Sequence, residues 1–299
     1  MNNANIWIMY RILHIYVRFN YIDNYKYLHI YKYIMDLDYL KKINHSGRNK
    51  NAIIAKINKV YGYYSSRFNI TPRKRLKMFN RGFNKILELC KQKYEKKANK
   101  YYTIRNKENK KYKIAQKYAL KELKRVFCLD KVKKKFNYVD EIVVHKTSSY
   151  AAKTHIIGDS DIDFTICIDS KLKVSDFEKC YKEIGETFLT KVGYRCKKCI
   201  QNTKKCELYQ VFTKMINGIE IEVKIRDLNA FSSLLRYHKY MNSCWNNDKK
   251  IYITYIKYLL SNPKVDEYTK FKWLIMEFGF YNAGVGKFFG PIDLNLKTK

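Results

Sequence analysis

The run Gly-Asp-Ser-Asp-Ile-Asp at residues 158–163 holds two carboxylates at a spacing that suits metal binding. On a strand, residues two apart point to the same face, so Asp161 and Asp163 project together while Ile162 enters the core. Two neighbouring carboxylates repel each other unless a cation lies between them, and hard oxygen ligands select Mg²⁺ or Mn²⁺. The run therefore predicts a metal site, with Asp159 as a turn residue before the strand.

A second pair of carboxylates lies on a later strand. The Asn-Gly pair at residues 217–218 is a strong hairpin signal between predicted strands at 208–216 and 219–225. Glu220 and Glu222 share one face of the second of these strands. One interpretation is that this strand supplies a third metal ligand. The other is that the two glutamates are solvated on an exposed face.

These elements, in this order, resemble the DNA polymerase β-like nucleotidyltransferase superfamily. That superfamily shows Gly-Ser, a loop, Ser-Asp-Ile-Asp, and later a strand with a third carboxylate. Residues 148–163 are similar in spacing to tRNA CCA-adding enzymes and oligoadenylate synthetases, and residues 217–223 are similar to the Thr-Gly-Leu-Glu-Val-Asp-Ile strand of noncanonical poly(A) polymerases. The resemblance covers about residues 140–228. It implies that Glu222 takes the third carboxylate position and that Glu220 has at most a supporting role.

The resemblance also implies a set of ligands. Two Mg²⁺ or Mn²⁺ ions would be held by the three carboxylates Asp161, Asp163 and Glu222, and a nucleoside triphosphate, with ATP favoured, would be the substrate. Ser149 and the backbone amides near Ser148 would bind the β- and γ-phosphates, with Lys153 as a further phosphate contact. The ions would clamp the attacking and leaving oxygens of an in-line displacement.

Two positions depart from the superfamily pattern, because Ser148 and Lys153 stand where the superfamily has glycines. Those glycines let backbone amides approach a triphosphate closely. Lys153 could add its own charge to the phosphate site, or it could mark a site that has decayed. Glu222 in place of an aspartate adds one methylene group to the third ligand.

We therefore expect a template-independent nucleotidyltransferase that transfers NMP from NTP to an RNA 3′ end, similar to a poly(A) polymerase. Two alternatives stay open at this point. One is a nucleotidyltransferase that acts on a small molecule or a protein. The other is a catalytically degenerate nucleotidyltransferase-fold protein that binds RNA without turnover.

The charge balance favours a polyanionic partner. The chain carries 61 Lys and Arg against 27 Asp and Glu, a formal net charge of +34. Such an excess attracts RNA or DNA and predicts binding that weakens steeply with salt. Abundant Lys, Asn, Ile and Tyr are also what an AT-rich genome produces. The lysine-rich stretch 91–113 is accordingly either a solvated helix surface or a nucleic-acid track.

The eight cysteines suggest a reducing compartment, and we expect an intracellular, cytoplasmic protein. Three of them lie in apolar stretches and are expected in the core: Cys90, Cys128 and Cys167. A cluster in the second half resembles part of a zinc site, although free thiols are the favoured interpretation. Its members are Cys196, Cys199 and Cys206, with His238 or Cys244 as a distant fourth ligand.

Periodicity predicts the elements that must position these residues. Residues 38–135 have helical spacing, and Thr71-Pro72 predicts a helix start. Further on, the pattern predicts strands at 141–145 and 162–168, a loop or short helix at 148–160, a helix at 174–189, helices from Ala230, and a loop at 284–291. Tyr237, Tyr240 and Trp245 could stack on a base, but a helical core is the favoured place for most of them.

The expected fold class is α+β, with a small mixed β-sheet nucleotidyltransferase core, flanking helices, and helical regions on both sides. We predict four parts: a basic aromatic extension at 1–34, a helical lysine-rich region at 35–136, the catalytic core at 137–228, and a C-terminal helical region at 229–299. Met35 is an alternative start, and the extension is weakly compatible with a membrane-surface anchor. No stretch is apolar for long enough to predict a membrane span.

Overall fold

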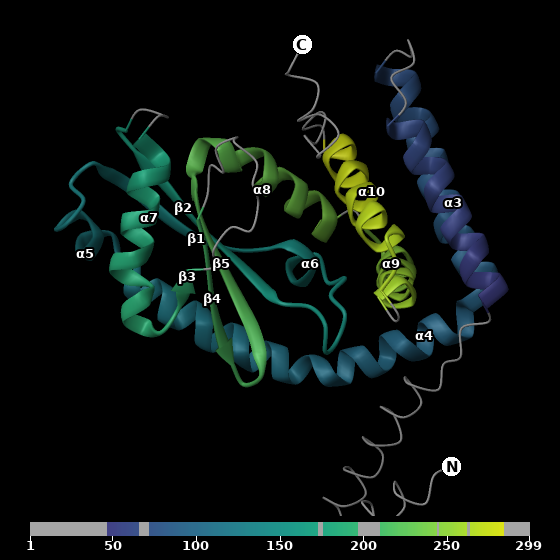
Figure 1. The fold of residues 1–299 in the computed structure, drawn as a ribbon, viewed down its shortest axis with the longest axis horizontal. Coiled ribbons are helices and arrows are strands. Elements are labelled where there is room, and N and C mark those ends of the chain that lie inside the picture. Colours follow the sequence, from purple (N-terminus) through teal and green to yellow (C-terminus); the bar gives the residue numbers. More distant parts are fainter. Residues whose placement is uncertain are drawn as a thin grey trace, which may run out of the picture. The chain divides into compact units, whose positions relative to one another are not determined.

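The fold is given by a computed structural model (Figure 1), in which the described residues are 47–65, 72–172, 176–196, 210–243, 245–261 and 264–283. The predictions made for residues 1–34 and for the loop at 284–291 lie outside the described residues. The described residues all belong to the unit His45–Lys299.

Five described strands form one mixed sheet in the order β1-β2-β5-β4-β3. β2 and β5 are parallel, whereas the pairs β1–β2, β4–β5 and β3–β4 are antiparallel. The strands are β1 (Val139–Thr147), β2 (Ile162–Ser170), β3 (Arg195–Cys196), β4 (Gln210–Ile216) and β5 (Ile219–Asp227). The mixed sheet and its flanking helices confirm the predicted α+β fold class.

The β4–β5 hairpin turns at the residues that the sequence singled out. Asn217 and Gly218 both have positive φ, at 51° and 74°. Turns of this hand match the right-handed twist of the two strands, which is why an Asn-Gly pair favours them. The turn sets Ile216 opposite Ile219, and this register determines the face on which each later residue of β5 lies.

The two faces of the sheet differ in chemistry. The even-numbered residues of β2, from Ile162 to Ile168, and the odd-numbered residues of β5, from Ile219 to Ile225, are buried in an apolar core. Helices α4 (Pro72–Val126), α5 (Leu129–Lys133) and α7 (Phe177–Phe188) contribute to the same core. The opposite face carries Asp163 and Thr165 on β2. Helices α6 (Ser148–Ala151) and α8 (Leu228–Ser243) contact β2 as well.

Helix α4 links the sheet to a second, helical core. It runs unbroken for 55 residues, about 80 Å at 1.5 Å per residue, and begins at Pro72 as the Thr-Pro signal predicted. Its C-terminal half packs against the sheet, and its N-terminal half contacts α3 (Gly47–Ser65), α9 (Asn247–Ser261) and α10 (Glu267–Asn282). Figure 1 shows α4 passing along both groups of elements.

Aromatic side chains fill the helical core. The Phe83 ring of α4 lies 4.5 Å from the Phe278 ring and 6.1 Å from the Phe271 ring, both on α10. Further along α4, the Tyr101 ring stacks on Tyr258 of α9 at 4.4 Å. These contacts anchor the C-terminal helices along α4.

A close helix contact joins α8 to α10. A Cβ atom at Gly279 of α10 would lie 2.1 Å from the ring of Tyr237 on α8, so a side chain at this position would collide with the ring. α8 also contacts β2 and β5. It therefore connects the polar face of the sheet to the helical core.

Most predicted elements appear with small shifts. The predicted helix at 174–189 is α7 (Phe177–Phe188), followed by a 3-10 turn at Thr190–Val192, and the short-helix option at 148–160 is realised as α6. Cys90 and Cys167 are buried as predicted, but the prediction for Cys128 is wrong because its side chain is exposed. Cys128 precedes α5 at the junction with α4, and helical periodicity does not determine which side a junction residue faces.

Within the described ranges, no helix is both long and apolar enough to cross a membrane. The four-part division of the chain stays a prediction. α4 contacts β1 and β5 as well as α3, α9 and α10, so a boundary at residue 136 separates elements that pack together.

The two faces of α4 should respond differently to the same substitution. Ile86 is fully buried, whereas Ile114 on the same helix is 59% exposed. Ile86→Ala should lower the free energy of unfolding by about 2–5 kcal/mol because it leaves a cavity in the core. Ile114→Ala should change it by less than about 0.5 kcal/mol. Urea denaturation checks both variants, and equal losses would contradict this placement of α4.

Candidate metal centre

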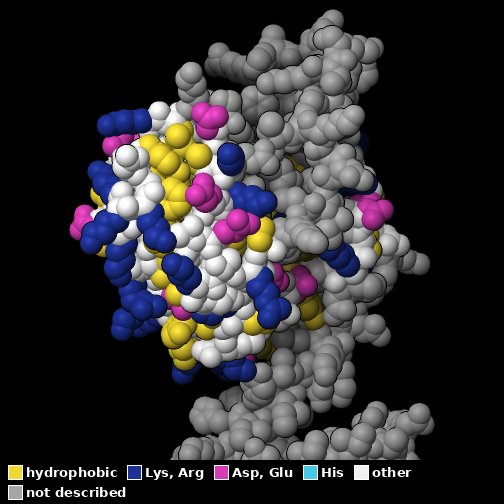
Figure 2. Space-filling view, turned by 60° about the vertical axis from the view of Figure 1, so that its left-hand side comes forward, with side chains coloured by type: hydrophobic (Ala, Val, Ile, Leu, Met, Phe, Trp, Pro, Cys, Tyr) yellow, Lys and Arg dark blue, Asp and Glu magenta, His cyan; other side chains and the backbone are white. Residues whose placement is uncertain are grey.

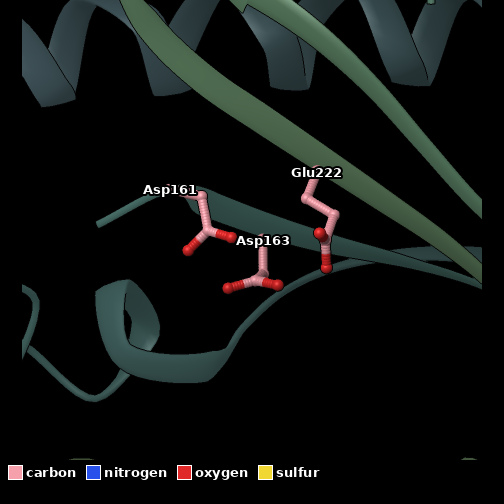
Figure 3. Close-up of side chains that lie close together, drawn as sticks. All are labelled: Asp161, Asp163 and Glu222. Carbon is pink, nitrogen blue, oxygen red and sulfur yellow. The ribbon is translucent and has the colours of Figure 1, made fainter. Parts of the chain in front are cut away.

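Three carboxylates converge on the polar face of the sheet (Figure 3). Asp161 directly precedes β2, Asp163 is the second residue of β2, and Glu222 lies in β5. One ligand oxygen from each lies within 4.8 Å of the others. The structure thus brings together the three residues that the sequence proposed as metal ligands.

The strand pairing explains this convergence. β2 and β5 are neighbours, and their parallel register sets Asp163 directly opposite Glu222. Because side chains alternate between faces, a slip of one residue in β5 would turn Glu222 into the apolar core. The register of the β4–β5 hairpin therefore decides whether the third carboxylate reaches the site.

The electrostatics of the cluster favour a bound cation. The pKa of Asp161 is raised to about 6, first by burial and then by repulsion from Asp163 and Glu222, while Lys224 and Lys272 oppose the rise. A divalent cation among the carboxylates would relieve this repulsion. Carboxylate oxygens are also the donors that Mg²⁺ and Mn²⁺ prefer, so the residues fit the expected ion.

A lysine that sequence reasoning missed lies inside this cluster. The Lys224 Nζ atom is 2.7 Å from Asp163 Oδ1 and 2.5 Å from Glu222 Oε1. Burial lowers the pKa of Lys224, but attraction by Asp163 and Glu222 outweighs burial and leaves the pKa raised. The available signal was its spacing, because Lys224 lies two residues after Glu222 and so shares its face.

The two positions that lack the expected glycines have glycine-like backbones. Ser148 has a φ of 56° and Lys153 has a φ of 58°. This left-handed region costs side-chain-bearing residues free energy, and it is the region that glycine occupies freely. At both positions the chain therefore has a backbone conformation that glycine occupies freely, but it carries a side chain there.

The backbone amide of Ser148 already has a partner. It donates to Nε2 of His238, which lies on α8, at 3.3 Å. Burial, and then repulsion from His145, lower the pKa of His238 to about 4, so the ring is neutral and can accept this hydrogen bond. An amide expected to bind phosphate is thus engaged by the helix that covers the sheet.

Buried cations hold the segment after α6. Lys257 of α9 donates to the backbone carbonyl of Thr154 at 2.8 Å. Arg105 of α4 donates to the backbone carbonyl of His155 at 3.2 Å, and its guanidinium lies 2.7 Å from Nδ1 of the same histidine. Both cations come from the helical core, and sequence periodicity gave no sign that they would meet this segment.

Lys257 is a cation in an unfavourable setting. Its pKa is lowered to about 7, first by burial and then by repulsion from Lys272, while Asp161 opposes the shift. Near α6 the pattern repeats, because burial and then the charge of Lys153 lower the pKa values of Lys146 and Lys250. Positive charge therefore accumulates around residues 146–155.

The remaining candidate site residues lie outside the carboxylate cluster. Asp159 is exposed in a turn as predicted, and Glu220 is not part of the carboxylate cluster. Tyr237 and Trp245 are buried in the helical core, as the favoured interpretation held, so they do not stack on a base. Tyr240 is half-buried on α8, and its stacking role stays a prediction.

The zinc hypothesis falls largely outside the described residues. Cys196 is exposed in β3, and Cys199, Cys206 and Cys244 lie outside those residues. His238, one of the candidate fourth ligands, accepts a hydrogen bond from Ser148.

Comparison with known proteins adds no relative. No protein-family model matches the chain, and a search of curated proteins finds no match either.

The left-handed backbone at Ser148 makes a stability prediction. Ser148→Gly should leave the free energy of unfolding unchanged or raise it by up to about 1 kcal/mol, because glycine occupies this φ without strain. Ser149→Gly, at the next residue of α6, should lower it by about 0.5–1 kcal/mol because glycine loses more entropy on folding. Denaturant unfolding of both variants checks this. An equal loss in both would contradict the backbone assignment.

Burial of Lys257 makes a pH prediction. Its folded-state pKa of about 7 lies below the ordinary value of 10.5, so the unfolded chain binds more protons between these values. The unfolding free energy of the wild type minus that of Lys257→Met should therefore be lowest near pH 6 and rise as the pH increases through 7 towards 10. Chemical denaturation across this range measures the difference.

The control for this measurement is Lys113→Met, which removes an exposed lysine of α4. The pH profile of this variant is the reference with which the Lys257→Met profile is compared. A flat difference for Lys257→Met would show that the lysine is hydrated in solution.

Proposed function

We propose that this protein is a metal-dependent, template-independent nucleotidyltransferase that transfers NMP from NTP to an RNA 3′ end, similar to a poly(A) polymerase. The observation that carries the proposal is the cluster of Asp161, Asp163 and Glu222 on adjacent parallel strands, with ligand oxygens within 4.8 Å of one another. The order and spacing of the sequence elements around this cluster support the same reaction class.

In the proposed mechanism the three carboxylates would hold divalent cations. Bound divalent cations would neutralise the triphosphate and lower the pKa of the attacking hydroxyl group. Asp161 and Asp163 would hold the ion that carries the triphosphate. Glu222, opposite Asp163 on β5, would contribute the third carboxylate of the cluster.

The positive charge around residues 146–155 supports a triphosphate substrate. Burial, and then the charge of Lys153, lower the pKa values of Lys146 and Lys250 near α6, while attraction by Asp161 raises the pKa of Lys257 against the effect of its burial. Among the described residues, none of these four lysines forms an ion pair with a carboxylate. A polyphosphate bound here would relieve their mutual repulsion and would meet the metal ligands.

The charge of α4 supports RNA as the acceptor. The stretch 91–113 lies on α4 with most of its tyrosines buried and most of its lysines exposed, so this surface is strongly cationic. Its exposed lysines are Lys91, Lys93, Lys96, Lys100, Lys107, Lys110, Lys111 and Lys113. Lys and Arg side chains also spread across the described part of the face in Figure 2. A phosphate backbone would be attracted to such a surface.

One arrangement favours a second candidate, an RNA-binding protein without turnover. The amide of Ser148 is engaged by His238, and the left-handed residues Ser148, at the start of α6, and Lys153, after its end, carry side chains where glycines would leave room. Both features oppose close approach of a triphosphate to the backbone. A chain that has lost transfer could still keep its cationic surface.

An extension assay tests the proposed reaction. RNA incubated with each NTP and with Mg²⁺ or Mn²⁺ should be lengthened by the wild type. Asp161→Asn combined with Asp163→Asn should reduce extension by about a hundredfold or more, because the ligands of the ion are lost. Asp169→Asn changes another aspartate of β2 outside the cluster and should keep the wild-type rate.

The other outcomes separate the alternatives. No extension by the wild type, or equal extension by the double variant, would contradict the proposal. Label from NTP that appears on protein or on a small molecule, and never on RNA, would favour those acceptors. RNA binding that survives loss of all three carboxylates, without nucleotide incorporation, would favour the binding protein.

A further inference from the structure

Lys224 occupies a position among the carboxylates that a cation would take. Its ammonium bridges two of the three, with Asp163 Oδ1 at 2.7 Å and Glu222 Oε1 at 2.5 Å. Both carboxylates belong to the set that could hold a metal ion. An ammonium at hydrogen-bonding distance from two carboxylates reduces the repulsion between them, as a metal ion would.

The position of Lys224 is built into the sheet. It lies on β5 opposite Thr165 of β2 and two residues after Glu222, so its side chain starts from the same face as the carboxylates. The side chain is only 18% exposed. Moving the ammonium into water would leave the nearly buried carboxylate of Asp163 without its partner, which carries a large free-energy cost.

Lys224 engages only part of the oxygen atoms that the cluster offers. Lys224 contacts Oδ1 of Asp163, which leaves Oδ2 for another ligand. Among the described residues, none donates a hydrogen bond to the carboxylate of Asp161. Three carboxylates carry three negative charges, which one ammonium and one divalent cation together neutralise.

We propose that Lys224 takes the place of one of the two metal ions that the superfamily resemblance implies. The site then holds a single divalent cation, bound by Asp161 and Asp163, next to the ammonium that bridges Asp163 and Glu222. This inference rests on the proposed function for the presence of a metal, and it differs from the resemblance in the number of ions. Lys224 acts as a permanent cation that is covalently part of the chain.

Manganese titration followed by electron paramagnetic resonance tests the inference, with Mn²⁺ alone as the probe. The wild type should bind one Mn²⁺ per chain in this site. Lys224→Met removes the ammonium without adding charge and should bind a second Mn²⁺, because the positive charge that lies against Asp163 and Glu222 is gone. Lys224→Arg keeps the positive charge and should stay at one ion.

The matched control is Lys214→Met on the neighbouring strand β4. Lys214 is also a mostly buried lysine in an ion pair, with its Nζ atom 2.8 Å from Glu122 Oε1 of α4, and it is not part of the carboxylate cluster. This variant should bind one Mn²⁺, as the wild type does. Circular dichroism of each variant verifies that it is folded before the titration.

The outcomes distinguish the two proposals. Two ions in the wild type would overturn the inference and leave the proposed function intact, and this result needs no variant to fold. One ion in both the wild type and Lys224→Met would also overturn it. No ion in the wild type would remove the metal premise of the proposed function, and the inference with it.

Discussion

The main constraint on the site is that two paired strands hold three carboxylates close together although these groups repel one another. Asp163 and Glu222 lie opposite each other in the parallel β2–β5 register, and Asp161 joins them from the residue before β2. Like charges that are this close together and this buried raise the free energy of the folded chain unless a cation is present. The raised pKa of Asp161 records this cost, and the ammonium of Lys224 offsets part of it. A cation beside these carboxylates therefore lowers the free energy of the folded chain.

Two helices of the helical core bring further cations to the segment that leads into this site. α4 and α9 belong to the helical core, yet Arg105 and Lys257 reach from them to the backbone of Thr154 and His155. That backbone leads directly into the turn before Asp161. The long α4 is what makes this possible, because it packs on the sheet at one end and on α3, α9 and α10 at the other. The aromatic contacts along α4 therefore also position the cations of the site.

The segment around α6 shows how the site differs from the pattern it resembles. Ser148 and Lys153 keep left-handed backbones, so the chain follows the path that glycine would allow while it carries two side chains. The Ser148 amide bonds to His238, and Lys153 adds charge beside Lys146. Binding of a phosphate at this amide requires that it replace the histidine as acceptor. α8 thus has a direct influence on the segment that a triphosphate would approach.

Local signals in the sequence determined the hairpin at residues 217–218, the β2 strand, the start of α4 at Pro72, and the pair Asp161 and Asp163, because turn chemistry and side-chain periodicity act between near neighbours. Glu222 was singled out by the superfamily resemblance, and its approach to the aspartates depends on the pairing of β2 with β5. The same signals did not predict, or predicted wrongly, the environment of some residues that lie between different elements. The apolar stretch around Cys128 predicted a place in the core, but Cys128 is exposed at a helix junction. Only the tertiary structure decided that Lys224 bridges Asp163 and Glu222, because that contact depends on which strand lies next to β2. Likewise, the burial of Lys257 depends on long-range packing of α9, and sequence spacing carries no information about such packing.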